Sequence, residues 1–434
     1  MNWGRRLVAT LSIARVPTLL VLGASVSQLA TIRQARAAGF RVVTVDRDPG
    51  AVGFAEADVA EALDFGDVEA VVSVARRERV DGVVAISTDR AVPTAAAVAE
   101  RLGLPGIGSE VARVMTNKAA MRSRLEECGV PQPRFAVASR GDAGVCLERI
   151  GLPAVLKPVD SGGQRGLFKL GSAGELTRLL PMALAYSRTG TVVLEQFVEG
   201  DELNVIAVVR GSAVSVLTLS DRLRPPGRGF GVGWIHLFPS ELPEPVLAQA
   251  RNVVVAAIEA LGLRNGIAFP QLLATAEGDV LVVEVAARIA AGQMADLVRL
   301  GIGVDLTKIA FEQALGRPVP DQLVEAEFER PIAIRFFTAS PGLLPTGEVV
   351  SVWGLDDVRA SRNVLESGLY IEIGETIRPV QVDADRRGYV IATGTDQRDA
   401  LAAANAAARK LTVITKAPIP PSEEAMPADT TFPL

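Results

Sequence analysis

Cysteine, histidine and long apolar runs are scarce in this chain of 434 residues, and each scarcity narrows the classes of protein that it can be. Its two cysteines, Cys128 and Cys146, are too few for a disulfide framework or a zinc site. We expect both to be inert core thiols, because free cysteine is usually buried. No apolar stretch reaches the roughly 18 residues of a membrane-spanning helix, since polar residues interrupt each candidate. The single histidine is the one side chain whose charge ordinarily changes near neutral pH.

Charge and composition indicate a globular enzyme without a nucleic-acid partner. The formal net charge is −5 and the arginines are scattered, so the sequence lacks the basic stripe of a nucleic-acid-binding surface. Hydrophobic residues make up 49% and charged residues 22%, as in ordinary folded domains, and the length favours about three of them. Residues 1–16 carry Arg5, Arg6 and Arg15 around an apolar patch that is too short for a signal peptide. We therefore expect a loose N-terminal extension and a soluble, cytoplasmic protein with no membrane partner.

Strands and helices alternate from residue 18 to about residue 110. This alternation predicts a parallel, doubly wound sheet of the α/β class. The turn 23–28 lacks the G-x-G-x-x-G spacing, and Asp46, which could reach a ribose, is followed by Arg47. A nicotinamide dehydrogenase is therefore a weaker alternative. The elements expected in this region are strands at 18–22, 41–46 and 82–87, a helix that ends at 38, and helices at 68–79 and 92–102.

The rest of the chain has an α+β pattern. Thr116 or Asn117 can cap a helix that runs to Cys128. Hairpin-like strand pairs follow, and Pro318 and Pro320 mark a boundary. The other expected elements are a helix at 245–261, strands near 333–337, 389–392 and 412–414, and an alanine-rich helix at 396–410. The expected domains are 1–109, 110–325 and 326–416, followed by a disordered tail over 417–434.

Two lysines and a glycine-rich loop form a candidate phosphate-binding region. Lys118 lies in the first turn of its helix, where it is either a solvated cation or, with the helix N-terminus, a phosphate ligand. Lys157 ends the apolar strand 152–156, where an ammonium is costly unless an anion meets it. The following loop, Ser161-Gly162-Gly163-Gln164-Arg165-Gly166, lets its backbone approach phosphate oxygens and can open and close. An ordinary β-turn beside a lysine that reaches solvent is the alternative.

The segment 192–202 has the pattern of a strand, a short hinge and a second strand. The hinge residues Glu195, Gln196, Phe197 and Val198 can offer free backbone N–H and C=O groups to the edge of an adenine. Glu195 or Glu202 can accept a hydrogen bond from a ribose hydroxyl. Coming after Lys157, this order favours a nucleotide site.

Residues 266–274 and 279–285 predict a β-hairpin around Glu277-Gly278. If that pair is a two-residue turn, Gln271 and Glu284 lie opposite each other on one face. The carboxylate of Glu284 follows an apolar run and therefore needs a counter-charge or a metal. Either Glu284 pairs with Arg288, or Glu284 and Gln271 hold Mg²⁺ beside a triphosphate while Arg288 contacts the transferred phosphoryl group.

The single histidine, His236, lies between these regions in the run Trp234-Ile235-His236-Leu237-Phe238-Pro239-Ser240. It can hydrogen-bond a reaction intermediate or carry a proton, and the alternative is a structural histidine at the end of a strand. Arg222 and Arg335 are the candidate anchors for a substrate carboxylate.

Taken in order, these motifs resemble the ATP-grasp superfamily of ligases over nearly the whole chain. The resemblance rests on Lys118, on Leu156-Lys157-Pro158 with its glycine loop, on the Glu195 hinge, and on Glu284 with Arg288. The Glu-x-Ala-Ala-Arg form and the histidine before Phe-Pro-Ser are similar to the L-amino-acid ligase branch, whose members join amino acids into dipeptides. The runs 334–337 and 387–390 resemble the final subdomain of that branch.

The resemblance implies a Rossmann-like pre-ATP-grasp domain, an ATP-grasp fold and a small α+β C-terminal subdomain. It also implies that Glu284 binds Mg²⁺, with Mn²⁺ as a substitute, and that Gln271 is a weaker metal ligand because many relatives have glutamate there. Arg288, His236 and Lys157 would carry the catalysis. The groups implied for ATP are Lys118 and Lys157 for phosphates, the loop residues Ser161, Gly162, Gly163 and Gly166, the hinge Glu195, Gln196, Phe197 and Val198 for adenine, and Glu202 for ribose.

The expected function is ATP-dependent ligation of a small carboxylate to a small amine, both expected to be amino acids. The reaction would pass through an acyl phosphate and release ADP and phosphate, which requires clustered cations. Two alternatives stay within the superfamily: a carboxylase that uses bicarbonate, and a catalytically degenerate ATP-binding protein, the latter because of Gln271. The resemblance is also compatible with a homodimer.

Overall fold

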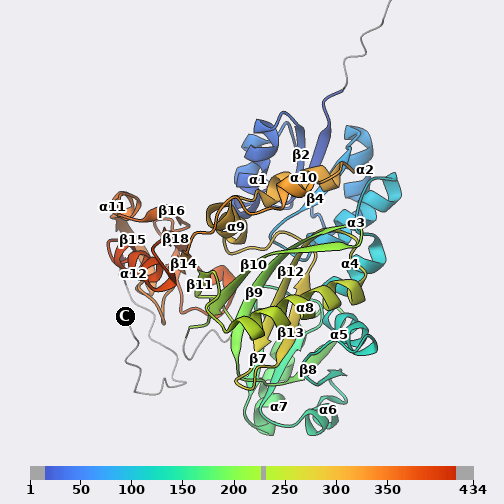
Figure 1. The fold of residues 1–434 in the computed structure, drawn as a ribbon, viewed down its shortest axis with the longest axis vertical. Helices are drawn as coiled ribbons and strands as arrows, with labels where there is room; N and C mark the ends of the chain where they lie inside the picture. Colours follow the sequence, from blue (N-terminus) through green and yellow to red (C-terminus); the bar gives the residue numbers. More distant parts are fainter. Residues whose placement is uncertain (1–14, 226–230, 417–434) are drawn as a thin grey trace, which may run out of the picture.

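The structure, a computed structural model, describes residues 15–225 and 231–416. Its N-terminal part is a parallel sheet with strand order β3-β2-β1-β4, drawn in blue in Figure 1. All five side chains of β1 are buried, as expected for a central strand of a parallel sheet covered on both faces. The elements of this part are β1 (Thr18–Leu22), α1 (Val26–Ala37), β2 (Arg41–Asp46), a 3₁₀ turn (Val52–Glu56), β3 (Val59–Ala62), α2 (Val68–Glu78), β4 (Gly82–Ala85) and α3 (Ala91–Leu102).

Two helices, α4 (Ser109–Thr116) and α5 (Lys118–Glu127), lead from this sheet to a small antiparallel sheet with strand order β5-β8-β6-β7. Asn117 is extended, and its side chain accepts a hydrogen bond from the Ala120 N–H, which caps α5. The small sheet is covered by α6 and α7. Its elements are β5 (Phe135–Ala138), α6 (Ala143–Ile150), β6 (Ala154–Pro158), β7 (Phe168–Leu170), α7 (Ala173–Ala185) and β8 (Val192–Gln196).

An eight-stranded antiparallel sheet with strand order β13-β12-β9-β10-β11-β14-β18-β16 forms the centre of the molecule. Side chains alternate between its two faces. Leu203, Val205 and Ala207 of β9 pack with α8, whereas Ile206 and Val208 pack with α9 and α10. The elements between 201 and 314 are β9 (Asp201–Arg210), β10 (Ala213–Leu223), β11 (Ile235–Phe238), α8 (Glu244–Leu261), β12 (Asn265–Ala274), β13 (Val280–Ala286), α9 (Met294–Ile302) and α10 (Leu306–Ala314).

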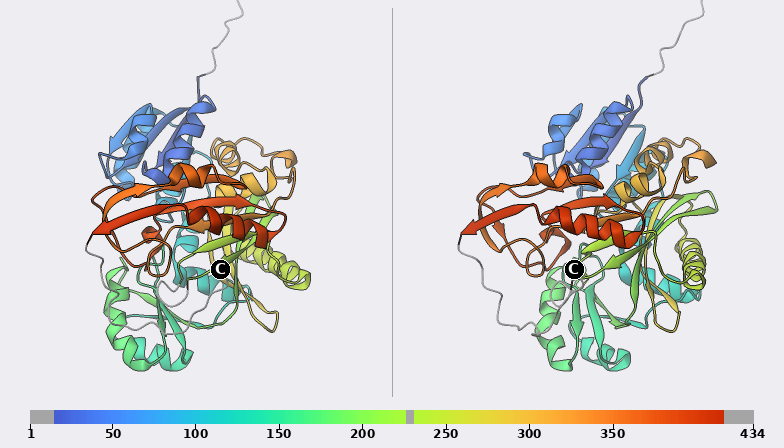
Figure 2. Two further views of the ribbon diagram at one scale, coloured as in Figure 1. Left: turned by 90° about the vertical axis from the view of Figure 1, so that its left-hand side faces the viewer. Right: turned by 60° about the vertical axis from the view of Figure 1, so that its left-hand side comes forward.

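The C-terminal part continues the large sheet and adds a three-stranded sheet with strand order β17-β15-β19. Ile235 of β11 pairs with Arg335 of β14, so one sheet crosses residue 325. Figure 2 shows this part, in orange and red, beside both the N-terminal sheet and the large sheet. Its elements are β14 (Ile332–Phe336), β15 (Gly347–Trp353), α11 (Leu355–Arg359), β16 (Val364–Leu369), β17 (Thr376–Ile377), β18 (Gly388–Thr393), α12 (Gln397–Ala408), β19 (Thr412–Lys416), and 3₁₀ turns at Asp321–Leu323 and Asp383–Asp385.

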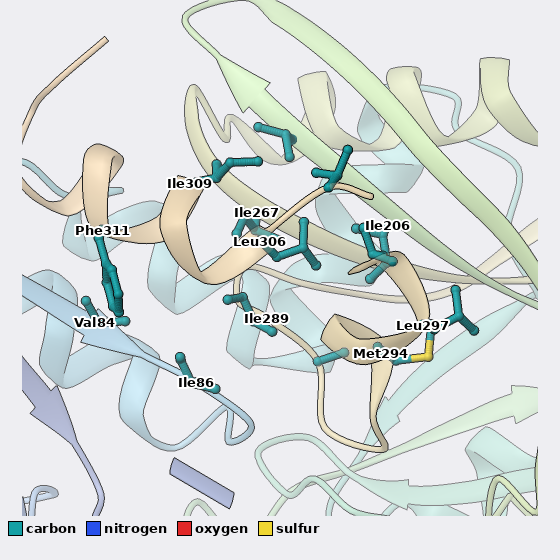
Figure 3. Packing of buried hydrophobic residues seen from close by; sticks show 14 of the residues in the cluster. Val84, Ile86, Ile206, Ile267, Ile289, Met294, Leu297, Leu306, Ile309 and Phe311 are labelled. Atoms are coloured by element: carbon teal, nitrogen blue, oxygen red, sulfur yellow. The ribbon is translucent and has the colours of Figure 1, made fainter. Parts of the chain in front are cut away.

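One buried cluster fixes the N-terminal sheet to the large sheet. Figure 3 shows Val84 and Ile86, at the end of β4, near Phe311 of α10 and Ile289. Ile86 and Ile289 also form a parallel backbone bridge, and the Ser87 N–H donates to the Ile289 carbonyl at 3.1 Å. The segment after β4 is therefore held against the segment after β13.

The structure departs from several of the sequence predictions. Helices α4, α6, α7, α9, α10 and α11 were not anticipated. Cys128 is exposed at the end of α5, whereas Cys146 is buried as expected. Arg15 bonds to the Asp81 carboxylate at 2.5 Å. The rest of the predicted loose extension, and the predicted disordered tail, lie outside the described residues. None of the helices in the described ranges is long and apolar enough to span a membrane.

Candidate active site

Six polar side chains project from one face of the eight-stranded sheet, opposite to the face that packs against α8. Gln271 pairs with both Asn204 and Glu284, and Arg222 pairs with His236. Residues paired across neighbouring strands share a face, so the register alone gathers these groups. The six are Glu202 and Asn204 from β9, Arg222 from β10, His236 from β11, Gln271 from β12 and Glu284 from β13.

The predicted pairing of Gln271 with Glu284 is confirmed, but the turn that was expected to produce it is wrong. The Thr275 N–H donates to the Asp279 carbonyl at 2.8 Å, so residues 276–278 form the loop. Such a loop alone would shift the register by one residue and turn Glu284 away from Gln271.

A β-bulge restores the register. Gln271 pairs with Glu284 and Leu272 pairs with Val282, which leaves Val283 as the extra residue. The guanidinium of Arg122 donates to the carbonyls of Val282 and Val283 at 2.8 Å each. Arg122 therefore holds the bulge that aims Glu284 into the site.

Lys157 and Glu195 form a buried ion pair with an Nζ–Oε2 distance of 2.9 Å. The Arg122 Nε donates to the other carboxylate oxygen at 2.7 Å. Burial raises the pKa of Glu195, but Arg122 and Lys157 outweigh it and lower the pKa to about 2. Burial lowers the pKa of Lys157, and the charge of Glu195 opposes this only partly. The anion that Lys157 requires is thus a protein carboxylate. Each oxygen of Glu195 already contacts a cation, and the contact of Glu195 or Glu202 with a ribose stays a prediction.

Glu202 and the two candidate carboxylate anchors have different surroundings from those expected. The Glu202 carboxylate forms ion pairs with Arg222 and Arg224, the latter with an Nε–Oε1 distance of 3.2 Å. Arg222 also donates to the Gly231 carbonyl, so it is occupied. Arg335 pairs with Ile235, one residue out of phase with His236, and therefore lies on the opposite face of the sheet. Neither arginine is a free carboxylate anchor in this site.

The glycine loop packs against groups from two other parts of the chain. The Lys118 Nζ donates to the Ser161 carbonyl at 2.8 Å. A Cβ on Gly162 would lie 2.9 Å from a carboxylate oxygen of Asp89, so a larger residue there would displace the Asp89 side chain. Gly166 has a φ of +74°, and a Cβ there would lie 2.9 Å from Pro158. Gly166 does not line the cleft described below. A glycine is therefore needed at this position for the backbone conformation of the loop.

Lys118 bridges the glycine loop and the predicted metal ligand. Its Nζ lies 3.0 Å from the Glu284 Oε1, and its side chain is 12% exposed. Burial lowers the pKa of Lys118, but Glu284 and Asp89 outweigh it and raise the pKa above its usual value. Lys118 is therefore a charged residue of the site and not a solvated cation.

Arg288 pairs with Asp89 and not with Glu284, so the alternative of a Glu284–Arg288 pair is wrong. The Arg288 Nε and Nη2 donate to the two Asp89 oxygens at 2.6 and 3.0 Å. Burial lowers the pKa of Arg288, but Asp89 outweighs it and raises the pKa. Asp89 follows β4, so the N-terminal sheet contributes a group that orients the arginine.

His236 is buried and hydrogen-bonded. Its Nδ1 lies 3.1 Å from the Asn204 Nδ2, and the Asn204 Oδ1 accepts from the Gln271 Nε2 at 3.1 Å. An amide N–H can only donate, so this assignment makes Nδ1 the acceptor and places the imidazole proton on Nε2. Burial, followed by the charges of Arg222 and Arg386, lowers the pKa of His236 well below 6.5. The imidazole is thus neutral at pH 7 and presents Nε2–H as a donor.

These groups line two adjoining chambers of one cleft. The first, called here the nucleotide chamber, is bounded by Lys118, Lys157, residues 161–165, the hinge 195–198 and Glu202. The second chamber is bounded by Asp89, His236, Phe269, Met294, Arg288 and Arg386. Gln164, Arg222, Gln271 and Glu284 line both. Lys157 and Arg288, which are far apart in the sequence, therefore face one cleft.

The hinge has fewer free backbone donors than expected. The Gln196 N–H donates to the Arg134 carbonyl at 2.9 Å, and the Phe197 N–H donates to the Pro153 carbonyl at 3.1 Å. The prediction that these two N–H groups are free for an adenine is wrong. Their side chains and Val198 still line the nucleotide chamber.

The residues near Glu284 suit a magnesium ion held together with phosphates. Within the described ranges, no group of three or more His, Cys, Asp or Glu side chains is placed to hold a metal. Glu284 provides one carboxylate and Gln271 one amide oxygen directly opposite. Mg²⁺ usually takes one or two carboxylates and completes its shell with phosphates and water, and Mn²⁺ accepts the same ligands.

The turn after β1 is filled by protein groups. The Ala24 N–H donates to the Asp46 carboxylate at 2.8 Å, and the Gln28 side chain closes against Gly23 and donates to the Ile86 carbonyl at 3.1 Å. Asp46 is thus occupied, which argues against a dinucleotide at this turn.

Sequence reasoning missed Asp89, Asn204 and Arg386. Asp89 had a usable signal, because it follows the carboxyl end of a parallel strand, where ligands of such sheets bind. The sequence around Asn204 predicts only that this residue lies in a strand and does not indicate that it belongs to the site. Arg386 follows a 3₁₀ turn near the C-terminus, and its guanidinium lies 4.4 Å from the Phe336 ring. Nothing local in the sequence connects it with His236.

Comparison with known families agrees with this architecture. Residues 32–106 match the ATP-grasp N-terminal domain, and residues 125–288 match the D-ala D-ala ligase C-terminus. The chain belongs to the ATP-grasp superfamily of ligases. Within it, residues 341–416 match the L-amino acid ligase C-terminal domain 2, which supports the predicted branch.

Individual relatives cover most of the chain. A formate-dependent phosphoribosylglycinamide formyltransferase from Ignicoccus hospitalis is 27% identical over 91% of this chain and 96% of its own. The L-amino acid ligase from Bacillus licheniformis has a similar fold, with a TM-score of 0.79, 23% identity, and coverage of 93% and 99% of the two chains.

Another protein of similar fold was solved with ligands. The biotin carboxylase domain dimer of the Hydrogenobacter thermophilus 2-oxoglutarate carboxylase, in complex with MgADP, ADP and bicarbonate, has a TM-score of 0.73 and 18% identity, with 92% and 90% of the chains covered. The chain spans 63% of the length of one curated relative and 37% of another.

Proposed function

We propose that this protein is an ATP-dependent ligase that joins a small carboxylate to a small amine, both of the amino-acid class, and releases ADP and phosphate. The observation that carries the proposal is the joined cleft, in which Lys118, Lys157 and Arg288 come from separate parts of the chain. Such a cluster is what a transferred phosphoryl group needs, because charge develops on its oxygens in the transition state.

In the proposed reaction, the substrate carboxylate attacks the γ-phosphorus of ATP, which forms an acyl phosphate and ADP. The amine then attacks the acyl carbon, and phosphate leaves with formation of the amide and release of a proton. Lys118 and Lys157 hold phosphate oxygens, and Arg288, kept in place by Asp89, contacts the phosphoryl group and the later oxyanion. Glu284 and Gln271 would hold Mg²⁺, which neutralises phosphate charge when bound.

The nucleotide chamber needs to open to admit ATP. Its volume is about 100 Å³, whereas small-molecule pockets commonly measure roughly 300–1,000 Å³. The glycine loop 161–166 closes the chamber, and its contact with Lys118 is a single hydrogen bond to a carbonyl. We infer that the loop moves outward to admit ATP and then closes over the acyl phosphate to exclude water.

The second chamber suits an amino acid. Arg386 lies beside His236 and stacks on Phe336, and its Nη2 is 3.6 Å from the Asp383 Oδ1. A substrate carboxylate would share Arg386 with Asp383 or displace Asp383 from it, while Phe269 and Met294 provide an apolar wall. His236 donates through Nε2–H to the developing oxyanion. His236 is not the proton acceptor in this scheme, because its Nδ1 already accepts a hydrogen bond from Asn204 and its Nε2 carries the proton.

The test is a screen for phosphate release over pairs of amino acids with Mg²⁺–ATP, with mass detection of the products. We expect an amide product and one ADP for each bond formed. Turnover that requires bicarbonate and forms no amide would replace the proposal with the carboxylase alternative. Tight ATP binding without ADP release across the panel would indicate the degenerate alternative. A homodimer remains a prediction, tested by light scattering.

The neutral state of His236 can be measured directly, because the chain has one histidine. Burial and two neighbouring arginines lower its pKa, so we expect the single imidazole Cε1–H signal in the NMR spectrum to stay constant from pH 8 to about pH 6. The urea-unfolded chain is the control and should titrate near the usual value. A midpoint close to 6.5 in the folded protein would contradict the proposed donor role.

A further inference from the structure

A further pocket lies on the reverse face of the large sheet and adjoins the cleft at one end. Arg335 pairs with Ile235, whereas His236 pairs with Ile334, so Arg335 and His236 point to opposite faces. The reverse face is covered by α12, and the pocket between them has a volume of about 720 Å³. It is large enough for a small molecule.

Arg335 lies in this pocket without a counter-charge. It is 9% exposed, and its Nε has no hydrogen-bond partner among residues 15–225 and 231–416. Its guanidinium lies 4.8 Å from the Trp234 ring. Burial, and then the charge of Arg409, lowers the pKa of Arg335 to about 10, and no described carboxylate opposes this. A buried guanidinium of this kind is costly unless an anion joins it.

The wall contributed by α12 adds polar groups to the same pocket. Gln397, Leu401, Asn405 and Arg409 recur at every fourth residue, so they line one side of the helix and its C-terminal end. The buried Oδ1 of Asn405 has no hydrogen-bond partner in the described part of the chain. Arg335, Arg409 and Asn405 therefore line one space, with the unpartnered Asn405 Oδ1 buried in its wall.

Four acids, Asp201, Glu202, Asp221 and Glu241, also line this pocket, but no ion pair joins any of them to Arg335 in the described part of the chain. Asp221 accepts hydrogen bonds from Ser240 at 2.5 Å and from Gln397 at 2.7 Å. Glu202 is paired with Arg222 and Arg224. The remaining walls include Leu223, Ile235, Leu237 and Leu401, which are apolar.

We propose that this pocket binds an apolar α-amino acid or a related apolar carboxylic acid. The carboxylate contacts Arg335 and Arg409, an α-ammonium group donates to the Asn405 Oδ1, and the apolar body packs on Trp234 and the leucines. At one end the pocket reaches Glu202 and Arg222, which also line the nucleotide chamber. An occupant would thus contact the strands that carry catalytic groups, without entering the cleft.

Equilibrium binding to the nucleotide-free full chain tests this site independently of any turnover. The probes for isothermal titration calorimetry are leucine, 4-methylpentanoate, the neutral 4-methylpentanamide and inorganic phosphate. We expect the two carboxylates to bind and the amide not to bind. Arg335→Leu and Arg409→Gln should each weaken 4-methylpentanoate at least about tenfold, because a charge-assisted pair is lost. Arg299→Gln, which changes an arginine that pairs with Asp296 and Glu366 outside both the cleft and this pocket, should leave that binding unchanged.

The controls separate the outcomes. Asn405→Leu should weaken leucine more than 4-methylpentanoate, since only leucine has the ammonium group. Arg409 is exposed, so its variant tests the site even if Arg335→Leu does not fold. The proposal is overturned if the wild type binds neither carboxylate at millimolar concentrations, or if binding is kept in Arg335→Leu as it is in Arg299→Gln. Binding of phosphate alone would overturn the ligand class.

Discussion

Replacing Arg288 by alanine should reduce ADP release by at least about a hundredfold, the scale of losing one preorganised charge-stabilising group. The guanidinium lines the second chamber and is held by Asp89 through two hydrogen bonds of 2.6 and 3.0 Å. It is therefore positioned before any substrate arrives. The measurement is initial-rate ADP formation with saturating ATP and the amino-acid pair that the screen identifies.

Two controls distinguish chemistry from scaffolding in this experiment. Arg299→Ala removes an arginine of α9 that pairs with Asp296 and Glu366 outside the cleft, and it should retain its activity. Asp89→Asn keeps the shape of the partner but weakens the pair, and we expect a loss smaller than for Arg288→Ala. Equal losses in Asp89→Asn and Arg288→Ala would mean that the arginine mainly joins the two sheets, and a folded Arg288→Ala variant of normal activity would reject its role altogether.

Much of the secondary structure could be predicted because it depends on local patterns. The limits of β1 and β2 are as expected, since apolar runs between polar turns define buried parallel strands. Helix α10 was missed although it joins the two sheets. Its sequence is a short amphipathic segment, which by itself does not predict a helix. Its packing against Val84 and Ile267 depends on the tertiary structure.

The hairpin of Gln271 and Glu284 shows how a correct pairing can rest on a wrong turn. Counting from Glu277-Gly278 gives the observed partners, but the loop is 276–278 and a bulge at Val283 compensates. The bulge depends on Arg122, which is far away in the sequence, so no local pattern could have revealed it.

Charge pairing was the least predictable part of the site. The sequence indicates that Lys157 and Glu284 need opposite charges, and this is confirmed, but it does not indicate which ones. The partners are Glu195 and Lys118, which arrive from other strands and helices. A sequence can therefore show that a buried charge needs an opposite charge, whereas the fold determines which residue supplies it.

Replacing Glu195 by glutamine should destabilise the protein by about 3–5 kcal/mol at pH 7, the usual cost of removing one partner from a buried ion network. The variant leaves the cations of Arg122 and Lys157 beside a neutral amide, and both are almost fully buried. The measurement is urea-induced unfolding, with Glu199→Gln, an exposed glutamate near the same hinge, as the matched control.

The pH dependence of the same variant gives a second, independent measure of this network. The folded-state pKa of Glu195 is lowered from the usual 4.5 to about 2, so its stabilisation is fully present above about pH 4.5 and is lost as the pH falls towards 2. The difference in unfolding free energy between wild type and Glu195→Gln should therefore shrink across that window and stay constant above it. A difference below about 1 kcal/mol at pH 7, or one that does not change down to pH 2, would show that the carboxylate is not the shared partner of Arg122 and Lys157.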